Sequence, residues 1–193
     1  MKKNATCNPV GTATTTWLTP RKVIAALGPF DLDPCTPVEG MPWPTAKRML
    51  TPAEDGLNTP WPKEDFVWHN PPYGKGIEKW LAKAADHGHG ITLVHVRMDT
   101  VWMHEQILNH PNARGLVFTC GRIRFHRLDG TAGEAPPVGS LFVAYGEVAA
   151  LALQHAVAVG AITGCYVPLN GRGGVAANDG GFGEETSALS LAQ

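Results

Sequence analysis

The stretch that decides the fold is residues 66–74, Phe66-Val67-Trp68-His69-Asn70-Pro71-Pro72-Tyr73-Gly74. Its first three residues are apolar, and a short apolar run before a turn predicts the end of a buried strand. Two consecutive prolines lack the amide hydrogens that a sheet ladder needs, so the chain leaves the sheet there. Each residue before a proline is also held extended. The sequence therefore predicts an amide, two rigid prolines and an aromatic ring at the carboxyl end of a strand, where open α/β sheets bind ligands.

The tetrad Asn70-Pro71-Pro72-Tyr73 carries groups that suit chemistry on an exocyclic amine of a nucleobase. Such an amine is a poor nucleophile because its lone pair is delocalised into the ring. The side-chain oxygen of Asn70 and the backbone carbonyl of Pro71 can accept its two hydrogens and localise that lone pair. The Tyr73 ring offers a face on which an extruded base can stack. A Pro-Pro turn with Asn70 as a turn former is the purely structural alternative.

The composition is that of a globular protein with one domain. The chain has 193 residues, 16 of them Lys or Arg and 17 Asp or Glu, and a net charge of −1. A surface that binds nucleic acid must therefore be a local basic patch. Four widely spaced cysteines without a Cys-x-x-Cys pair argue against a disulfide framework and a zinc site, so no metal is expected. Without a secretory signal or a bilayer-spanning apolar stretch, we expect a cytoplasmic protein that does not bind membranes.

Three segments are expected along the chain: a flexible arm at 1–16, a domain at 17–169, and a Gly-rich, disordered tail at 170–193. Within the domain, apolar runs alternate with helical periodicity, which predicts an α/β fold. Strands are expected from residue 30 and at 48–50, 66–68, 91–96, 116–120, 140–145 and 162–169. Helices are expected after Thr19 and at 77–85, 101–108 and 147–159. The second of these is amphipathic, with Lys75, Lys79 and Lys83 expected toward water.

Candidate binding residues lie in the first third of the domain. Thr19 and Pro20 suit the cap and the first position of a helix. Asp33, followed by Pro34, comes at the carboxyl end of the first strand, where a carboxylate can pair with an ammonium group. An Asp-Pro turn explains the same residues equally well. Asp55 belongs to a loop-like segment whose acids suit an adenine amine or ribose hydroxyls.

Candidate DNA contacts follow two later strands. Arg122, Arg124 and His126 alternate with apolar residues, so their side chains share one face of an extended segment. Cations beside aromatic rings suit a phosphate backbone and an unstacked base. A solvated hairpin is the alternative. Arg97 follows the strand at 91–96 and lies on the same edge as Asn70 if the two strands are parallel.

Several segments occur in the order found in one family. They are Trp17-x-Thr19-Pro20, Phe30-x-Leu32-Asp33-Pro34, Asp55-Gly56-Leu57 with Pro60-Trp61, Asn70-Pro71-Pro72-Tyr73-Gly74, Arg97-x-Asp99-Thr100-x-Trp102 and Gly121-Arg122-Ile123-x-Phe125. Together they cover residues 17–145, and in them the chain resembles the phage-encoded, Dam-like DNA N6-adenine methyltransferases. One feature departs from the general methyltransferase pattern, because no Gly-x-Gly follows the first strand.

This resemblance implies a Rossmann-like class I methyltransferase fold, as a single domain with a mixed sheet. It implies transfer of a methyl group from S-adenosylmethionine to adenine in DNA. The expected setting is a bacteriophage enzyme in the host cytoplasm, with a role in restriction–modification. Asn70, Pro71, Pro72 and Tyr73 would hold the target adenine. The donor would be held by five residues, with Thr19, Pro20 and Asp33 at its methionine end, Pro34 beside them, and Asp55 at its adenine end.

Two kinds of alternative stay open on the sequence. The same chemistry suits a cytosine amine, an RNA base or a protein amide. A catalytically inactive DNA-binding module is the alternative that is not an enzyme. Binding of S-adenosylmethionine separates an enzyme from such a module.

Overall fold

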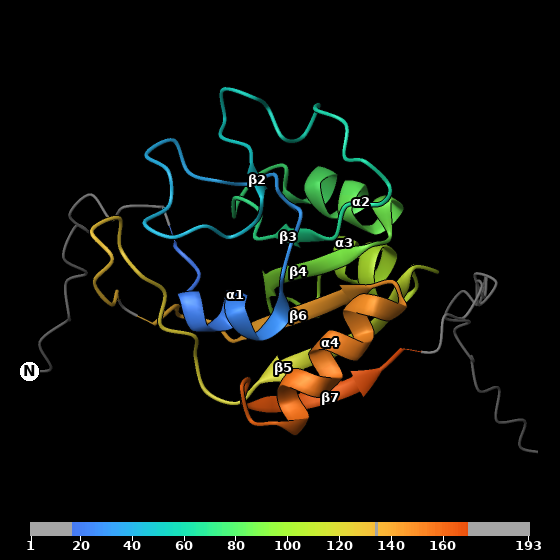
Figure 1. The fold of residues 1–193 in the computed structure, drawn as a ribbon. Coiled ribbons are helices and arrows are strands. Elements are labelled where there is room, and N and C mark those ends of the chain that lie inside the picture. Colours follow the sequence, from blue (N-terminus) through green and yellow to red (C-terminus); the bar gives the residue numbers. More distant parts are fainter. Residues whose placement is uncertain (1–16, 134, 170–193) are drawn as a thin grey trace, which may run out of the picture.

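The apolar runs of the sequence pair into one mixed sheet of seven strands in this computed structural model, which describes residues 17–133 and 135–169. The strand order is β2-β1-β3-β4-β6-β5-β7 (Figure 1). The strands are β1 (Leu32–Asp33), β2 (Arg48–Met49), β3 (Val67–His69), β4 (Gly90–His95), β5 (Ala113–Thr119), β6 (Ser140–Tyr145) and β7 (Gly164–Pro168). Each lies at a run from which a strand was predicted. The expected arm at 1–16 and tail at 170–193 lie outside the described residues.

The strand directions place the segments that follow several strands at one edge of the sheet. β2, β1, β3 and β4 are parallel, whereas β6 is antiparallel to both β4 and β5. β5 therefore runs in the same direction as β4. The carboxyl ends of β1, β3, β4 and β5 meet at this edge, so the residues that follow Asp33, His69, His95 and Thr119 are neighbours there. The prediction that Arg97 lies on the same edge as Asn70 is confirmed.

The helices are α1 (Arg21–Leu27), α2 (Ile77–His87), α3 (Val101–Met103) and α4 (Glu147–Ala158). α3 continues without a break as a π-helical turn, η1 (His104–Leu108). The prediction that Thr19 caps the first helix is wrong. Pro20 occupies the N-cap position of α1, and no side chain caps it. Thr19 points its hydroxyl elsewhere, toward Asn70.

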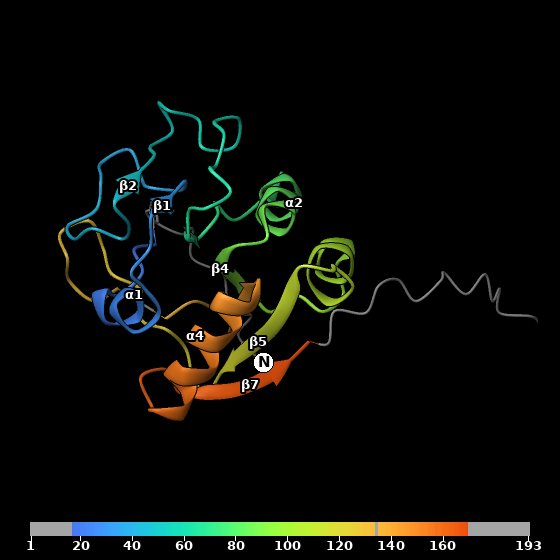
Figure 2. The ribbon, with the colours of Figure 1, turned by 45° about the vertical axis from the view of Figure 1, so that its right-hand side comes forward.

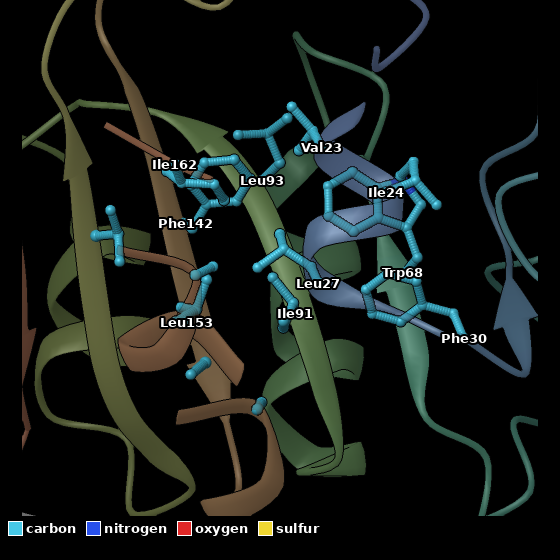
Figure 3. Packing of buried hydrophobic residues seen from close by; sticks show 14 of the residues in the cluster. Val23, Ile24, Leu27, Phe30, Trp68, Ile91, Leu93, Phe142, Leu153 and Ile162 are labelled. Carbon is cyan, nitrogen blue, oxygen red and sulfur yellow. The ribbon is translucent and has the colours of Figure 1, made fainter. Parts of the chain in front are cut away.

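Two apolar clusters cover the two faces of the sheet. α1 and α4 pack on one face, and α2 packs with α3 and η1 on the other (Figures 1 and 2). The first cluster includes Leu27 of α1, Ile91 of β4 and Leu153 of α4, which Figure 3 shows with their neighbours. All six residues of β6 are buried, as expected of a strand with helices on both faces. Because the faces are covered, polar side chains gather at the edge where the strands end.

No helix in the described part of the chain has the length and apolar character needed to cross a membrane.

Candidate active site

A cavity of about 480 Å³ opens where β1 and β3 end, and we call it the first cavity. Its lining comes from four parts of the chain: Trp17, residues 34–39, residues 51–56 in part, and the stretch from Asn70 to Trp80. In full, the lining residues are Trp17, Pro34, Cys35, Thr36, Pro37, Val38, Glu39, Thr51, Pro52, Asp55, Gly56, Asn70, Pro71, Pro72, Tyr73 and Trp80. The whole predicted tetrad thus faces one cavity, together with Pro34 and Asp55.

Asn70 is held in the lining of this cavity by three hydrogen bonds. Its Nδ2 donates to the carbonyl oxygen of Trp17 at 3.3 Å and to Oγ1 of Thr19 at 3.4 Å. Its Oδ1 accepts from the Tyr73 hydroxyl at 3.2 Å. An amide oxygen has two lone pairs, so one remains for a further donor. The Pro71 carbonyl accepts no hydrogen bond from the described residues. Two adjacent residues of the lining therefore each have an acceptor available.

Tyr73 is fixed at its hydroxyl and across its ring. The hydroxyl also contacts the carbonyl oxygen of Leu93 at 3.2 Å. The ring stacks on His95 with a centroid distance of 4.0 Å and an interplanar angle of 11°. Burial raises the pKa of the Tyr73 hydroxyl, and burial followed by the charge of Arg97 lowers the pKa of His95. The tyrosine stays protonated at neutral pH, and a base that stacks on it must use the face opposite His95.

Asp33 lies behind the cavity wall and not on its surface. Its side chain accepts hydrogen bonds from the Thr45 hydroxyl and, at 2.9 Å, from the backbone N–H of Cys35. The residue is 4% exposed, and burial raises the pKa of its carboxyl to about 6. Asp33 therefore positions the Pro34–Cys35 turn that lines the cavity, and it places a carboxyl close beneath that turn.

The loop at 55–57 is pressed against this turn. Gly56 has no side chain, and a Cβ there would overlap the Pro34 carbonyl oxygen. Asp55 has a φ of +48°, an uncommon conformation for a residue other than glycine. Its carboxylate accepts a hydrogen bond from Asn58 Nδ2 at 2.7 Å. The glycine of the Asp55-Gly56-Leu57 motif thus explains how two distant segments meet at one wall.

Lys83 holds the same loop from below, and the prediction that it faces water is wrong. Its Nζ donates to the carbonyl oxygens of Leu57 and Thr59 at 2.6 Å and of Gly56 at 3.2 Å. The ammonium also lies 4.8 Å from the centre of the Trp61 ring. Burial lowers the pKa of Lys83, and the charge of Asp55 opposes that shift. Lys83 orders the loop that carries Asp55.

The first cavity has the character of a site for an organic cation with an aromatic group. Among its described lining residues, the charged ones are Glu39 and Asp55, and none is Lys or Arg. The buried Thr36 hydroxyl has no hydrogen-bond partner among the described residues. Such a group costs free energy unless a ligand satisfies it. Trp17 and Trp80 add aromatic faces, which attract cations and stack on rings.

The remaining predicted residues lie outside the first cavity. Thr19 is 1% exposed and reaches Asn70 from behind. Pro20 lines a second cavity, together with Arg122 and Arg124. Arg97 is exposed and lies 3.7 Å from Asp99 in a loose ion pair. Of the predicted residues, the tetrad, Pro34 and Asp55 line the first cavity, and Pro20, Arg122 and Arg124 line the second. Thr19, Asp33 and Arg97 line neither.

Three residues of this region escaped sequence reasoning. Thr36 follows a proline-rich turn and had no motif to mark it. Trp80 has the helical spacing of the apolar face of α2, so its position in the sequence predicts burial in the core. His95 ends β4 within an apolar run, and only the three-dimensional position of Tyr73 reveals its role. The part of the chain that the structure describes contains no cluster of metal-ligating side chains.

Comparison with known proteins gives one match. The family model described as DNA N-6-adenine-methyltransferase (Dam) matches residues 8–147. No curated protein and no solved structure matches the chain. The matched range includes the lining of both cavities except for residues 161–163, in the turn between α4 and β7.

Proposed function

Because the chain belongs to the DNA N-6-adenine-methyltransferase (Dam) family, and is thereby an S-adenosylmethionine-dependent enzyme that methylates adenine in DNA, we propose that the methyl transfer takes place in the first cavity. The observation that carries the proposal is the pair of acceptors in the cavity lining. Asn70 Oδ1 keeps a free lone pair, and the adjacent Pro71 carbonyl accepts no hydrogen bond from the described residues. These two oxygens belong to adjacent residues of the cavity lining, and an exocyclic amine has one hydrogen for each.

The residues of the first cavity fit the methyl donor. S-adenosylmethionine carries a sulfonium and an ammonium cation, and the charged residues described in the lining are acids. Asp55 and Glu39 would face its polar groups, Thr36 would gain a hydrogen-bond partner, and Trp80 would cover an aromatic ring. Asp33, beneath the Pro34 turn, would attract the ammonium group. When bound, this donor supplies an activated methyl group.

The tetrad then acts on the target amine in three ways. Asn70 Oδ1 and the Pro71 carbonyl accept the two N6 hydrogens, which draws the nitrogen toward a tetrahedral shape and localises its lone pair. Tyr73 fixes Asn70 through its hydroxyl and stacks on the base through its open face. Pro72 keeps the turn rigid. No side chain has to remove a proton beforehand, because the amine loses it readily once alkylated.

The strand arrangement supports a Rossmann-like class I methyltransferase domain at residues 17–169. Four parallel strands, β2-β1-β3-β4, are extended by one strand of opposite direction and then by β5. Arg97, Arg122 and Arg124 all follow strands that end at the active-site edge, and we assign them to DNA contacts. A bacteriophage origin, a role in restriction–modification and a place in the host cytoplasm complete the proposal, and these rest on the sequence resemblance.

Calorimetric titration with S-adenosylmethionine tests the site assignment. We expect the wild-type chain to bind the donor and Gly56→Val to bind it far more weakly, because a side chain at position 56 separates the Pro34 turn from the 55–57 loop. Gly139→Val is the matched control, since position 139 lines neither cavity and a Cβ there meets its neighbours at ordinary distance. Unchanged donor affinity in Gly56→Val would place the donor elsewhere, and no heat from the wild type would indicate an inactive binding module.

A further inference from the structure

A second cavity, of about 700 Å³, lies beside the first. Its walls come from the start of α1, the loop after β5 and the turn before β7. The segment at 17–20 separates the two cavities, since Trp17 lines the first and Pro20 lines the second. This partition is held in place by a short antiparallel bridge, in which Leu18 and His126 exchange backbone hydrogen bonds of 3.2 and 2.8 Å.

The second cavity is cationic. Arg21, Lys22, Arg122 and Arg124 line it, and none of its described lining residues is acidic. No ion pair between described residues involves any of these four. Arg122 Nη1 donates to the Pro136 carbonyl oxygen at 2.6 Å, which fixes its guanidinium at the wall. A cavity with this charge attracts an anion, and the paired N–H donors of an arginine guanidinium fit two oxygens of a phosphate group.

The floor of the same cavity is apolar. It is formed by Val23, Phe142 and Ile162, which are buried members of one core cluster and lie near one another (Figure 3). Trp43 stands at the wall, with its Nε1 donating to the Thr19 carbonyl oxygen at 3.1 Å. Binding of phosphates alone needs a cationic surface and no apolar recess. A flat apolar ring next to an anion, by contrast, is the chemistry of a nucleotide, whose base stacks on aromatic side chains while its phosphate meets cations.

The two cavities are close enough to hold one DNA strand. Pro20 follows Trp17 after three residue steps, and an extended chain covers at most about 10 Å over three steps. That is about three steps of the 3.4 Å that separate stacked bases along one strand. A volume of about 700 Å³ falls within the range of small-molecule sites.

We propose that the second cavity binds an unstacked nucleotide of the substrate strand, within about three positions of the target adenine. Its base lies against the half-buried Trp43 and Ile123 of the lining, next to the apolar floor, and its phosphate lies among Arg21, Lys22, Arg122 and Arg124. The enzyme thus holds two nucleotides out of the stack, one in each cavity. The proposal rests on the proposed function, because the substrate strand is the one whose adenine reaches Asn70.

Binding of single strands with and without bases tests this assignment and needs no knowledge of the recognition sequence. The probes are an oligothymidylate of about 12 nucleotides and an abasic strand with the same number of phosphates, since single-strand grooves cover about 4–16 nucleotides. We expect the wild type to bind the oligothymidylate about 5- to 100-fold more tightly, the effect of a stacked base. Equal affinity for the two strands would overturn the proposal.

A variant that fills the second cavity shows where the base binds. Ala161 is exposed and lines this cavity, whereas Ala158 is exposed on α4 and does not. We expect Ala161→Trp to lower the affinity ratio below the wild-type value and Ala158→Trp to keep the wild-type ratio, with both variants unfolding at the wild-type temperature. An unchanged ratio in Ala161→Trp would overturn the proposal.

Methyl transfer to adenine-containing DNA, measured separately, distinguishes failure of this site from failure of the proposed function. Transfer with equal affinity for both strands refutes the second cavity alone. Absence of transfer with a base-dependent affinity refutes the proposed reaction and leaves the nucleotide site supported.

Discussion

The Tyr73 hydroxyl donates a hydrogen bond to Asn70 Oδ1 over 3.2 Å, so that the aromatic residue of the tetrad orients its amide. The same hydroxyl reaches the Leu93 carbonyl oxygen in β4, and the ring lies flat on His95. The amide is thereby anchored to two strands, β3 and β4, which are parallel neighbours in the sheet. Catalytic groups held in this way need no reorganisation when the substrate arrives.

Removing this hydroxyl should reduce the rate of methyl transfer. In Tyr73→Phe the ring can still stack on His95 and on the base, but Asn70 Oδ1 loses its hydrogen-bond donor, one of three partners that hold the amide. We expect kcat to fall about five- to tenfold, the equivalent of one hydrogen bond of about 1 kcal/mol. Single-turnover kinetics measure the effect. Tyr166→Phe, outside both cavities, serves as the control, and a Tyr73→Phe rate equal to the wild-type rate would contradict the role of the hydroxyl.

The loop at 55–59 should depend on Lys83. In Lys83→Met the three carbonyl oxygens lose a charged donor, and we expect the free energy of unfolding to fall by about 1–3 kcal/mol. Donor affinity should fall as well, because the loop carries Asp55. Lys79→Met, on the same helix and exposed, is the matched control for charge. Calorimetric titration and denaturant unfolding give the two values, and a Lys83 variant indistinguishable from the Lys79 variant would refute the role of these hydrogen bonds.

Asp33 should make stability depend on pH in the acid range. Burial raises the pKa of its carboxyl from 3.8 to about 6 in the folded protein. Between these values the folded state holds a proton that the unfolded state has lost, so the contribution of Asp33 to stability declines as pH rises from about 4 to 6. Asp33→Asn removes this decline. We therefore expect the Tm of the variant to rise relative to the Tm of the wild type as the pH increases from about 4 to 6. A constant difference would contradict the raised pKa.

Donor binding should show the opposite pH trend. An ammonium group near Asp33 favours the ionised carboxylate, so wild-type affinity for S-adenosylmethionine should increase from about pH 5 to pH 7. The increase should be smaller in Asp33→Asn, and the variant should bind the donor more weakly at neutral pH. Calorimetry at several pH values measures both, and equal pH dependence in the two proteins would separate Asp33 from the donor site.

DNA affinity should depend on the two arginines of the second cavity. Replacing both Arg122 and Arg124 by Ala should weaken binding to all DNA sequences and leave donor binding unchanged. The slope of log affinity against log salt should decrease by about 0.9 for each duplex phosphate that the variant no longer neutralises. The control is the Lys63→Ala, Lys79→Ala pair, which removes the same charge from exposed positions elsewhere. If the double variant keeps the wild-type salt slope and loses thermal stability, the two arginines stabilise the fold and do not contact DNA.

Much of the sheet is predictable from local sequence, and the reason is burial on both faces. β6 and β4 are almost continuously apolar, which leaves little choice of register or neighbour. The tetrad could be placed at a strand end for a related reason, since Pro71 and Pro72 cannot join a ladder. The resemblance also indicates residues on the other wall of the first cavity, because that wall carries the Asp55-Gly56 motif.

Interactions between distant segments could not be predicted, because periodicity describes only one element at a time. Lys79 and Lys83 have the same helical spacing, yet Lys83 alone lies under a loop more than twenty residues earlier in the chain. Thr19 has the properties of a helix cap, but the Asn70 amide is its partner in the folded chain. The stacking of Tyr73 on His95 likewise depends on the pairing of β3 with β4.

The most direct test of the catalytic assignment is nucleoside analysis of unmethylated DNA after incubation with S-adenosylmethionine labelled in its methyl group. We expect the label in N6-methyladenine with the wild type, and a rate lower by on the order of a hundredfold or more with Asn70→Ala, which loses one preorganised acceptor and keeps donor binding. Asn109→Ala, an exposed position after η1, should behave as the wild type. Label in methylcytosine, or near-normal turnover by Asn70→Ala, would contradict the assignment of the tetrad to adenine methylation.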